Sequence, residues 1–323
     1  MTRSTPVLAR FRRPAVETTT RIAVLTDLHL STEMTGSWRV SHRTEERFAA
    51  TVDSLNRQAL DAVVFAGDLV QSGLRAEFEA FDRILAGLDA PFFAIPGNHD
   101  LIDRGSGPTF TLGEFEDRYT PGALPYHVQI GDVDVLALNS NRSTRTSVAE
   151  SYEGRLEAAS LDWLEDALSS VENPLVVVHH NLPETRALLM AALEQLPVSG
   201  GSPGFENADD LVDVLARGGN PLVLTGHVHF PAVTSNRGVP EFTLPSLGPY
   251  PNAYTVLEID DRGTTAYMHA VADYDDRLES FVHGHEHCRV MLAASQLAGL
   301  PLVDELDRST ADDPDLVAPD ETG

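Results

Sequence analysis

Five short apolar stretches of this chain each end in a small cluster of polar residues, and this repeated pattern constrains the fold most. Each stretch has the length of a buried strand. The carboxyl ends of the strands in an α/β sheet converge on one crevice, so we expect side chains far apart in sequence to meet there. The five clusters are Asp27-Leu28-His29, Gly67-Asp68, Gly97-Asn98-His99-Asp100, His179-His180 and Gly226-His227-Val228-His229.

Helical segments alternate with these strands. Residues 44–60 have apolar residues at helical spacing and lie between apolar strands at 21–26 and 62–66. This alternation predicts an α/β fold with parallel strands. Further strands are expected at 92–95, 133–138, 175–178 and 222–224, and an antiparallel meander at 241–244, 254–259 and 264–270.

The chain divides into three expected segments. Residues 1–20 are polar and expected to be irregular, and residues 21–272 hold all five clusters in one predicted domain. Residues 273–323 form an expected C-terminal extension, which is helical over 275–300 and ends in an acidic, disordered tail.

The formal net charge is −26, and every basic residue except histidine is an arginine. Molar salt shortens the reach of carboxylate repulsion to about 3 Å, so this composition predicts a salt-adapted, halophilic protein. A GC-rich genome would explain the missing lysine, but it explains the surplus of carboxylates less well. The charge also disfavours a nucleic-acid partner bound through a broad basic face.

The single cysteine, Cys288, excludes an internal disulfide and a thiolate metal cluster. No window approaches the roughly 18 apolar residues of a membrane helix. No apolar run follows the N-terminal arginines, so we expect no secretory signal and a cytoplasmic protein.

The residue types in the clusters predict a metal site. Carboxylate, imidazole and amide ligands suit manganese, iron, cobalt or zinc. A carboxylate that bridges two ions holds them roughly 3.5–4 Å apart, and a water that both ions share loses its proton near neutral pH.

The order Asp-x-His, Gly-Asp, Gly-Asn-His-Asp, His and Gly-His-x-His resembles that of the calcineurin-like metallophosphoesterases over residues 21–270. The resemblance implies an α/β fold of two mixed β-sheets packed face to face, with helices on both outer faces. It also implies hydrolysis of a phosphoester with two divalent metal ions, for which we expect manganese, with iron, zinc or cobalt as alternatives.

The resemblance assigns roles to particular residues. His99 would be the general acid that protonates the leaving oxygen, while a metal-bound hydroxide attacks phosphorus in line. His179 and His180 compete for one ligand position, and we predict His179. The resemblance implies one ion held by Asp27, His29, Asp68 and His229, and a second held by Asp68, Asn98, His179 and His227, with Asp68 bridging.

The residues after the bridging carboxylate indicate the branch of the family. Protein phosphatases of this superfamily have an Asp that orients the catalytic histidine, and an Arg, where this chain has Gln71 and Ser72. The orienting carboxylate is therefore missing here, which disfavours a phosphoprotein substrate. The segment 67–78 instead resembles that of the cyclic-nucleotide and glycerol phosphodiesterases. We therefore expect a phosphodiesterase or phosphomonoesterase that acts on a small molecule. The alternatives are a nuclease of the repair-exonuclease type and a non-catalytic, metal-stabilised scaffold that binds proteins.

Some candidate residues are left outside this predicted site. In the segment 283–287, helical spacing would let only His283 and His287 share an ion, and we expect His283, His285 and His287 to form a solvated helix face. The sequence does not predict an oligomeric state. Other side chains that could line the cleft are His42, His127, Arg104, Arg142, Arg145 and Tyr250.

Overall fold

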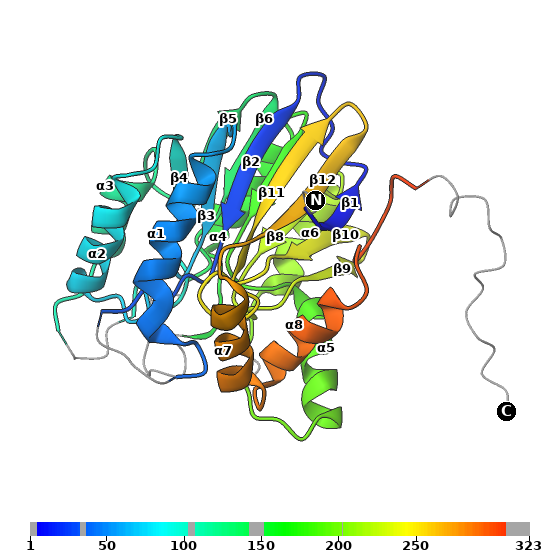
Figure 1. Ribbon diagram of the computed structural model, residues 1–323. Helices are drawn as coiled ribbons and strands as arrows, with labels where there is room; N and C mark the ends of the chain where they lie inside the picture. Colours follow the sequence, from blue (N-terminus) through cyan, green and yellow to red (C-terminus); the bar gives the residue numbers. More distant parts are fainter. Residues whose placement is uncertain (1–4, 33–36, 103–106, 142–151, 202, 308–323) are drawn as a thin grey trace, which may run out of the picture.

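The computed structural model describes residues 5–32, 37–102, 107–141, 152–201 and 203–307, and two six-stranded sheets form its centre (Figure 1). The first sheet has the order β1 (Val7–Phe11), β12 (Gly263–Ala270), β11 (Ala253–Asp260), β2 (Thr20–Leu25), β3 (Ala62–Ala66) and β4 (Phe92–Ile95). The second has the order β5 (Tyr126–Ile130), β6 (Val133–Ala137), β7 (Pro174–Val177), β8 (Leu222–Thr225), β10 (Val239–Thr243) and β9 (Ala232–Asn236).

Both sheets are mixed, as the resemblance implied. β2, β3 and β4 are parallel, whereas β11, β12 and β1 continue the first sheet in antiparallel pairs. β6, β7, β8 and β10 are parallel, and β5 and β9 close the two edges of the second sheet in antiparallel pairs. The predicted fold class is therefore confirmed.

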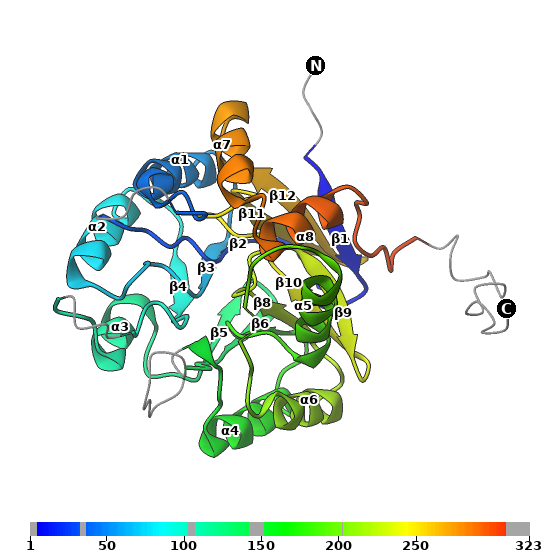
Figure 2. The ribbon, with the colours of Figure 1, turned by 90° about the horizontal axis from the view of Figure 1, so that it is seen from below.

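Alternation along the strands explains why the apolar stretches are continuous. Ile22 and Val24 of β2 point between the two sheets, whereas Ala23 and Leu25 point to the outer face. Helices cover that outer face, so both sets of side chains are buried and the strand has no polar face. Three helices cover the first sheet (Figure 2), namely α1 (Thr44–Leu55), α2 (Arg75–Leu85) and α3 (Leu112–Tyr119).

The outer face of the second sheet is covered by α4 (Ala158–Leu168) and α6 (Ala208–Arg217). Three more helices, α5 (Pro183–Gln195), α7 (Tyr274–Gly284) and α8 (Cys288–Leu297), gather at the end of the sheets where β2 terminates (Figure 1). None of the described helices combines the length and the apolar character needed to cross a membrane.

Two of the sequence expectations on the ends of the chain need correction. β1 lies inside the segment that was expected to be irregular, and it pairs with β12 at the sheet edge. The single helix expected over 275–300 is divided at 285–287, where a turn leads into His287, whose backbone is extended. Backbone hydrogen bonds from Ser199 to Glu286 and from Cys288 to Ser199 pair this point with residue 199. Residues 308–323, where the disordered tail was expected, lie outside the described residues.

The C-terminal extension packs on the rest of the chain at both of its ends. The buried guanidinium of Arg47 in α1 contacts Asp276 and donates a hydrogen bond of 2.7 Å to Ser280, both in α7. Further on, the backbone N–H of Leu302 donates to the carbonyl of Leu8 at 2.7 Å. The boundary expected at 272/273 remains a prediction.

Candidate metal centre

The predicted ligands lie in five turns, each directly after a parallel strand: β2, β3, β4, β7 and β8. We call these the ligand turns. The backbone there is unusual, because most L-residues avoid positive φ. Five of the nine described non-glycine residues with positive φ are predicted ligands, namely Asp27, His29, Asp68, His227 and His229, with φ between 48° and 69°. Such costly conformations concentrate at functional sites, where the surrounding fold holds them.

Two glycines let the ligand turns approach each other closely. Gly67 has φ of +94°, and a Cβ there would lie 2.5 Å from Nδ1 of His179. A Cβ on Gly97 would lie 2.2 Å from Oδ1 of Asp68. Any side chain at either position would therefore displace a predicted ligand.

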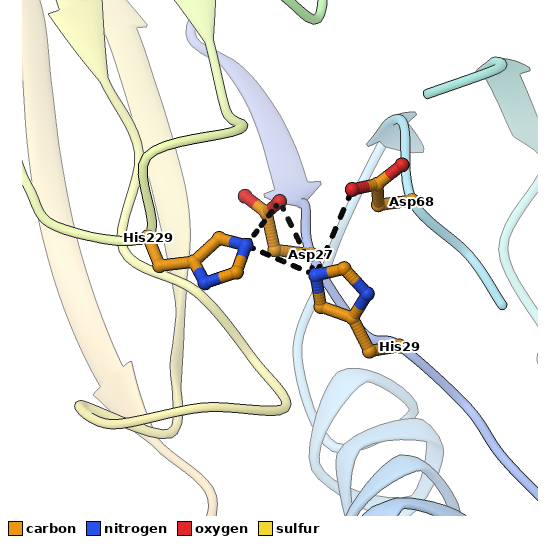
Figure 3. A group of neighbouring side chains, drawn as sticks. All are labelled: Asp27, His29, Asp68 and His229. Carbon is orange, nitrogen blue, oxygen red and sulfur yellow. Dashed lines mark hydrogen bonds and ion pairs between the residues drawn. The ribbon is translucent and has the colours of Figure 1, made fainter. Parts of the chain in front are cut away.

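The first predicted ligand group is compact and buried (Figure 3). The donor atoms of Asp27, His29, Asp68 and His229 all lie within 4.8 Å of one another. Nε2 of His229 is 3.1 Å from Oδ1 of Asp27 and 3.0 Å from Nε2 of His29. Ligands about 2.1 Å from one ion stand roughly 3.0–3.6 Å apart, so these spacings suit a shared cation.

The second predicted group meets the first at Asp68. Oδ2 of Asp68 lies 3.6 Å from Nε2 of His29 and 3.4 Å from Nε2 of His179. Oδ1 of Asn98 lies 2.9 Å from Nδ1 of His227, and the rings of His179 and His227 are 5.3 Å apart. One carboxylate oxygen thus stands between imidazoles of both groups.

Unpaired buried atoms indicate that this geometry fits cations. Oδ2 of Asp68 and Nε2 of His179 are buried without a hydrogen-bond partner in the described structure. Buried polar atoms without a partner are costly, so the pair needs a third group between them. The donor set also suits borderline divalent metals such as manganese or zinc.

Burial and neighbouring charges set the pKa values of the predicted ligand histidines. Burial lowers the pKa of His29 and of His229, and the nearby arginines lower it further, so both imidazoles stay neutral. A neutral imidazole is the form that binds a metal ion. Burial acts to lower the pKa of His179 too, but the Asp68 carboxylate outweighs it and raises the pKa to about 9.

The structure separates the two adjacent histidines. Nδ1 of His179 lies 2.9 Å from the carbonyl oxygen of Ala66, which accepts its hydrogen and leaves Nε2 facing Asp68. A backbone partner of this kind fixes the tautomer of ligand histidines. Nδ1 of His180 instead lies 2.7 Å from Oγ of Ser140. This geometry favours His179 as the ligand.

His99 lies beside the predicted ligands, and its ring meets that of His29 edge to face at 4.7 Å. Its backbone N–H donates to Oδ1 of Asp68 at 2.8 Å, and its Nδ1 donates to the backbone carbonyl of Gln71 at 2.6 Å. Because a carbonyl only accepts, Nδ1 carries the hydrogen and Nε2 is the nitrogen that can exchange a proton. The sequence indicated that the orienting carboxylate was missing, and a backbone carbonyl at the same turn orients the ring here.

Asp100, the last residue of its cluster, links the ligand turns that follow β3 and β4 through hydrogen bonds. Its two carboxylate oxygens accept the backbone N–H groups of Val70 and Gly97 at 2.9 and 2.8 Å. Burial and the charge of Asp68 raise the pKa of Asp100.

The structure separates most of the other candidates from the ligand turns. His283 and His285 are exposed, the first in the last turn of α7 and the second directly after that helix. Tyr250 contacts Phe281 of α7. His42 pairs with Glu279 and His127 with Asp134, each through Nε2. Arg104, Arg142 and Arg145 lie outside the described residues.

Three residues that the sequence did not indicate, Trp38, Arg39 and Arg289, lie next to the ligand turns. His287 lies there too, half-buried against Trp38, and not on the solvated helix face that was expected. Trp38 stacks on the ring of His229 at 5.3 Å and on that of His287 at 3.9 Å. Arg39 lies against Trp38, and Arg289 donates from Nη1 to the backbone carbonyl of His227 at 3.0 Å. Trp38 and Arg39 come from an irregular loop and Arg289 from the extension, and no local motif marked these three residues.

A buried cluster of Asp, His and Asn at the strand ends of two packed mixed sheets defines the class of metal-dependent phosphoester hydrolases. A family model described as calcineurin-like phosphoesterase matches residues 20–231. The chain belongs to this family, and it is a metallophosphoesterase, as the order of its clusters indicated.

Relatives with curated descriptions agree with the predicted branch. The chain is 28% identical over 225 residues to a probable cyclic nucleotide phosphodiesterase from Synechococcus sp., covering 69% of this chain and 78% of the relative. It is 29% identical over 212 residues to a 3',5'-cyclic-nucleotide phosphodiesterase from Nostoc sp., covering 64% of this chain and 71% of the relative. A solved dimetal phosphatase from Danio rerio matches with a TM-score of 0.59 at 11% identity, covering 78% of this chain and 99% of that one, which supports the fold.

Proposed function

We propose that this chain hydrolyses a small-molecule phosphodiester at a dinuclear metal centre. The observation that carries the proposal is the position of Oδ2 of Asp68, which lies 3.6 Å from Nε2 of His29 and 3.4 Å from Nε2 of His179. A carboxylate oxygen between two sets of imidazoles is what a bridging ligand requires. Similarity to proteins described as cyclic-nucleotide phosphodiesterases supports the diester as substrate.

The proposed ligand sets are those that the resemblance implied, and the distances within each group support them. Asp27, His29, Asp68 and His229 would hold one ion, and Asp68, Asn98, His179 and His227 the other. When bound, such ions activate water as a nucleophile and neutralise charge on the phosphoryl oxygens. The mixed oxygen and nitrogen donors favour manganese, with iron, zinc or cobalt as substitutes.

His99 is the proposed general acid. Its Nδ1 is engaged by the carbonyl of Gln71, so Nε2 of the protonated ring would give its hydrogen to the leaving alkoxide. The backbone bond to Asp68 ties the position of His99 to the same carboxylate that would bridge the ions.

An activity panel tests the proposed function. Purified protein is supplied with manganese and offered bis-nitrophenyl phosphate, a cyclic nucleotide, a glycerophosphodiester, a phosphomonoester and labelled DNA. We expect the small diesters to be hydrolysed fastest. Faster degradation of DNA would favour the nuclease, and a metal-loaded protein inert towards the whole panel would favour the non-catalytic scaffold.

The acidic composition supports adaptation to high salt. With a net charge of −26, the folded chain repels itself at low ionic strength, and salt screens that repulsion. We expect the melting temperature to rise from low to molar sodium chloride, measured at constant pH. A fall over that range would contradict the salt adaptation. The cytoplasmic location stays a prediction.

A further inference from the structure

Two arginines beside the ligand turns differ from the surface arginines of this acidic chain. Surface arginines commonly pair with carboxylates, as Arg217 does with Glu165 at 2.8 Å. Arg39 and Arg289 form no ion pair within the described residues, and the Nε atom of each is buried without a hydrogen-bond partner. We call these two residues the arginine pair.

Arg289 comes from the first turn of α8 and is only 7% exposed. Its Nη1 donates to the backbone carbonyl of His227, which is a predicted ligand. Burial lowers the pKa of Arg289, and the charges of Asp27 and Asp68 act to raise it. The guanidinium therefore lies within electrostatic reach of both carboxylates of the predicted ligand set.

Arg39 reaches the same place from the loop that follows the first ligand turn. Its Cζ lies 4.7 Å from the centre of the Trp38 ring. Burial, followed by the charge of Arg289, lowers the pKa of Arg39 to about 10, so it remains a cation near neutral pH. Arginine keeps its charge in proteins near neutral pH, so two cations lie here close enough to repel each other.

The stack of Trp38 on His287 brings the two arginines together. The rings are 3.9 Å apart and 9° from parallel, and Trp38 also stacks on His229 of the first ligand group. His287 caps the start of α8, where its Nδ1 accepts the backbone N–H of Arg289 at 3.4 Å. One continuous set of contacts thus links a predicted ligand to the extension that carries Arg289.

The balance of charge around the arginine pair indicates that an anion binds there. The predicted ligand set has two carboxylates, Asp27 and Asp68, and the arginine pair offsets them. Two divalent ions would then leave a strongly positive, buried site, which must be balanced by an anion. Guanidinium groups bind the oxygens of phosphate through paired hydrogen bonds.

We propose that Arg39 and Arg289 bind the phosphate oxygens of the substrate, so that the C-terminal extension completes the active site. This inference rests on the proposed function, because it takes the phosphoester as the ligand. Both residues act in substrate binding, and His99 remains the residue that moves a proton.

The test compares Arg39→Gln and Arg289→Gln with the unaltered full chain, each loaded with manganese. Binding of inorganic phosphate is measured by titration calorimetry, and kcat and KM are measured with bis-nitrophenyl phosphate. We expect each change to weaken phosphate binding and kcat/KM by about 10- to 100-fold, as for loss of a charge-assisted hydrogen bond. Arg277→Gln, which makes the same charge change on α7, should alter either value by less than about twofold.

Two further measurements separate a binding role from a structural one. The metal content and melting temperature of Arg39→Gln and Arg289→Gln should match those of the unaltered protein. Arg289→Lys keeps the positive charge, and it should recover only part of the phosphate affinity that Arg289→Gln loses. Wild-type phosphate affinity in folded, metal-loaded Arg39→Gln and Arg289→Gln would overturn the inference. If the unaltered chain hydrolysed no phosphoester yet these variants lost phosphate binding, the proposed function would fail and the anion site would stand.

Discussion

The ligand turns and the C-terminal extension contribute to the same site in different ways. The ligand turns belong to β2, β3, β4, β7 and β8, whose order in the sheets fixes their separation. The extension is held by a few backbone hydrogen bonds, such as that from Leu302 to Leu8, and by side-chain contacts, such as those of Arg47 with Asp276 and of Trp38 with His287. The ligand turns are fixed by continuous strands of the two sheets, whereas the extension is fixed by isolated contacts.

This difference separates two kinds of function. Metal ligands must hold fixed distances from one another, so they come from strand ends with strained backbone and close glycines. Groups that bind a substrate can come from a segment that packs against the finished sheets. We therefore expect substitutions in the ligand turns to abolish activity, and substitutions that loosen the extension to have smaller effects.

The largest effect is expected for Asp68→Asn. The change keeps the shape of the side chain, and with it the hydrogen bond from His99, but it removes the charge shared by both predicted ion sites. We expect activity to fall by at least about 1000-fold and bound manganese, measured by elemental analysis, to be lost. The exposed control Asp162→Asn should keep both its activity and its bound manganese. An active Asp68→Asn variant would contradict the bridging role of Asp68.

A slightly smaller effect is expected for His99→Gln. General acid groups contribute about 10²- to 10⁴-fold, so kcat should fall by that factor while metal content stays the same. The loss should be greater for an alkyl diester than for bis-nitrophenyl phosphate, because nitrophenolate leaves without a proton. An equal loss for both substrates would argue against a proton-donating role.

Arg47→Met tests how the extension is held. The guanidinium of Arg47 is buried between α1 and α7, and its removal leaves Asp276 without its partner. We expect the free energy of unfolding to fall by about 3 kcal/mol, measured by denaturant titration. Adding Asp276→Leu to Arg47→Met should recover part of this loss. Manganese binding to the ligand turns should change little.

The smallest effect is expected for the double change His283→Ala and His285→Ala. Both side chains are exposed, that of His283 in the last turn of α7 and that of His285 directly after it. Metal content and kcat/KM should stay within about twofold of the unaltered chain. Loss of an ion from this variant would show that the extension holds a metal of its own.

The sequence identified the strands that carry the ligand turns more reliably than the surrounding segments. The range 62–66 was predicted to the residue, because a strand buried on both faces is apolar throughout. α3 lies between the expected strands at 92–95 and 133–138, where the sequence analysis predicted no helix, although Thr111 and Glu114 form a capping box there. β1 was missed because its pairing with β12 joins residues that are distant in sequence.

The sequence by itself determined the family, the two-sheet fold and the hydrolase class. Its order of Asp, His, Gly and Asn clusters after apolar strands sufficed, because strand ends in such a fold converge on one crevice. The predicted ligands lie together in the structure, and their binding of two ions remains the proposal to be tested.

Only the tertiary structure decided what surrounds those ligands. The surroundings of Trp38, Arg39 and Arg289 depend on neighbours from other segments, and none of the three belongs to a local motif. The histidine tract of 283–287 predicted a solvated His287, whereas its stack on Trp38 half-buries it. The orientation of His99 was likewise decided by a backbone carbonyl, which every residue carries and no sequence pattern can distinguish.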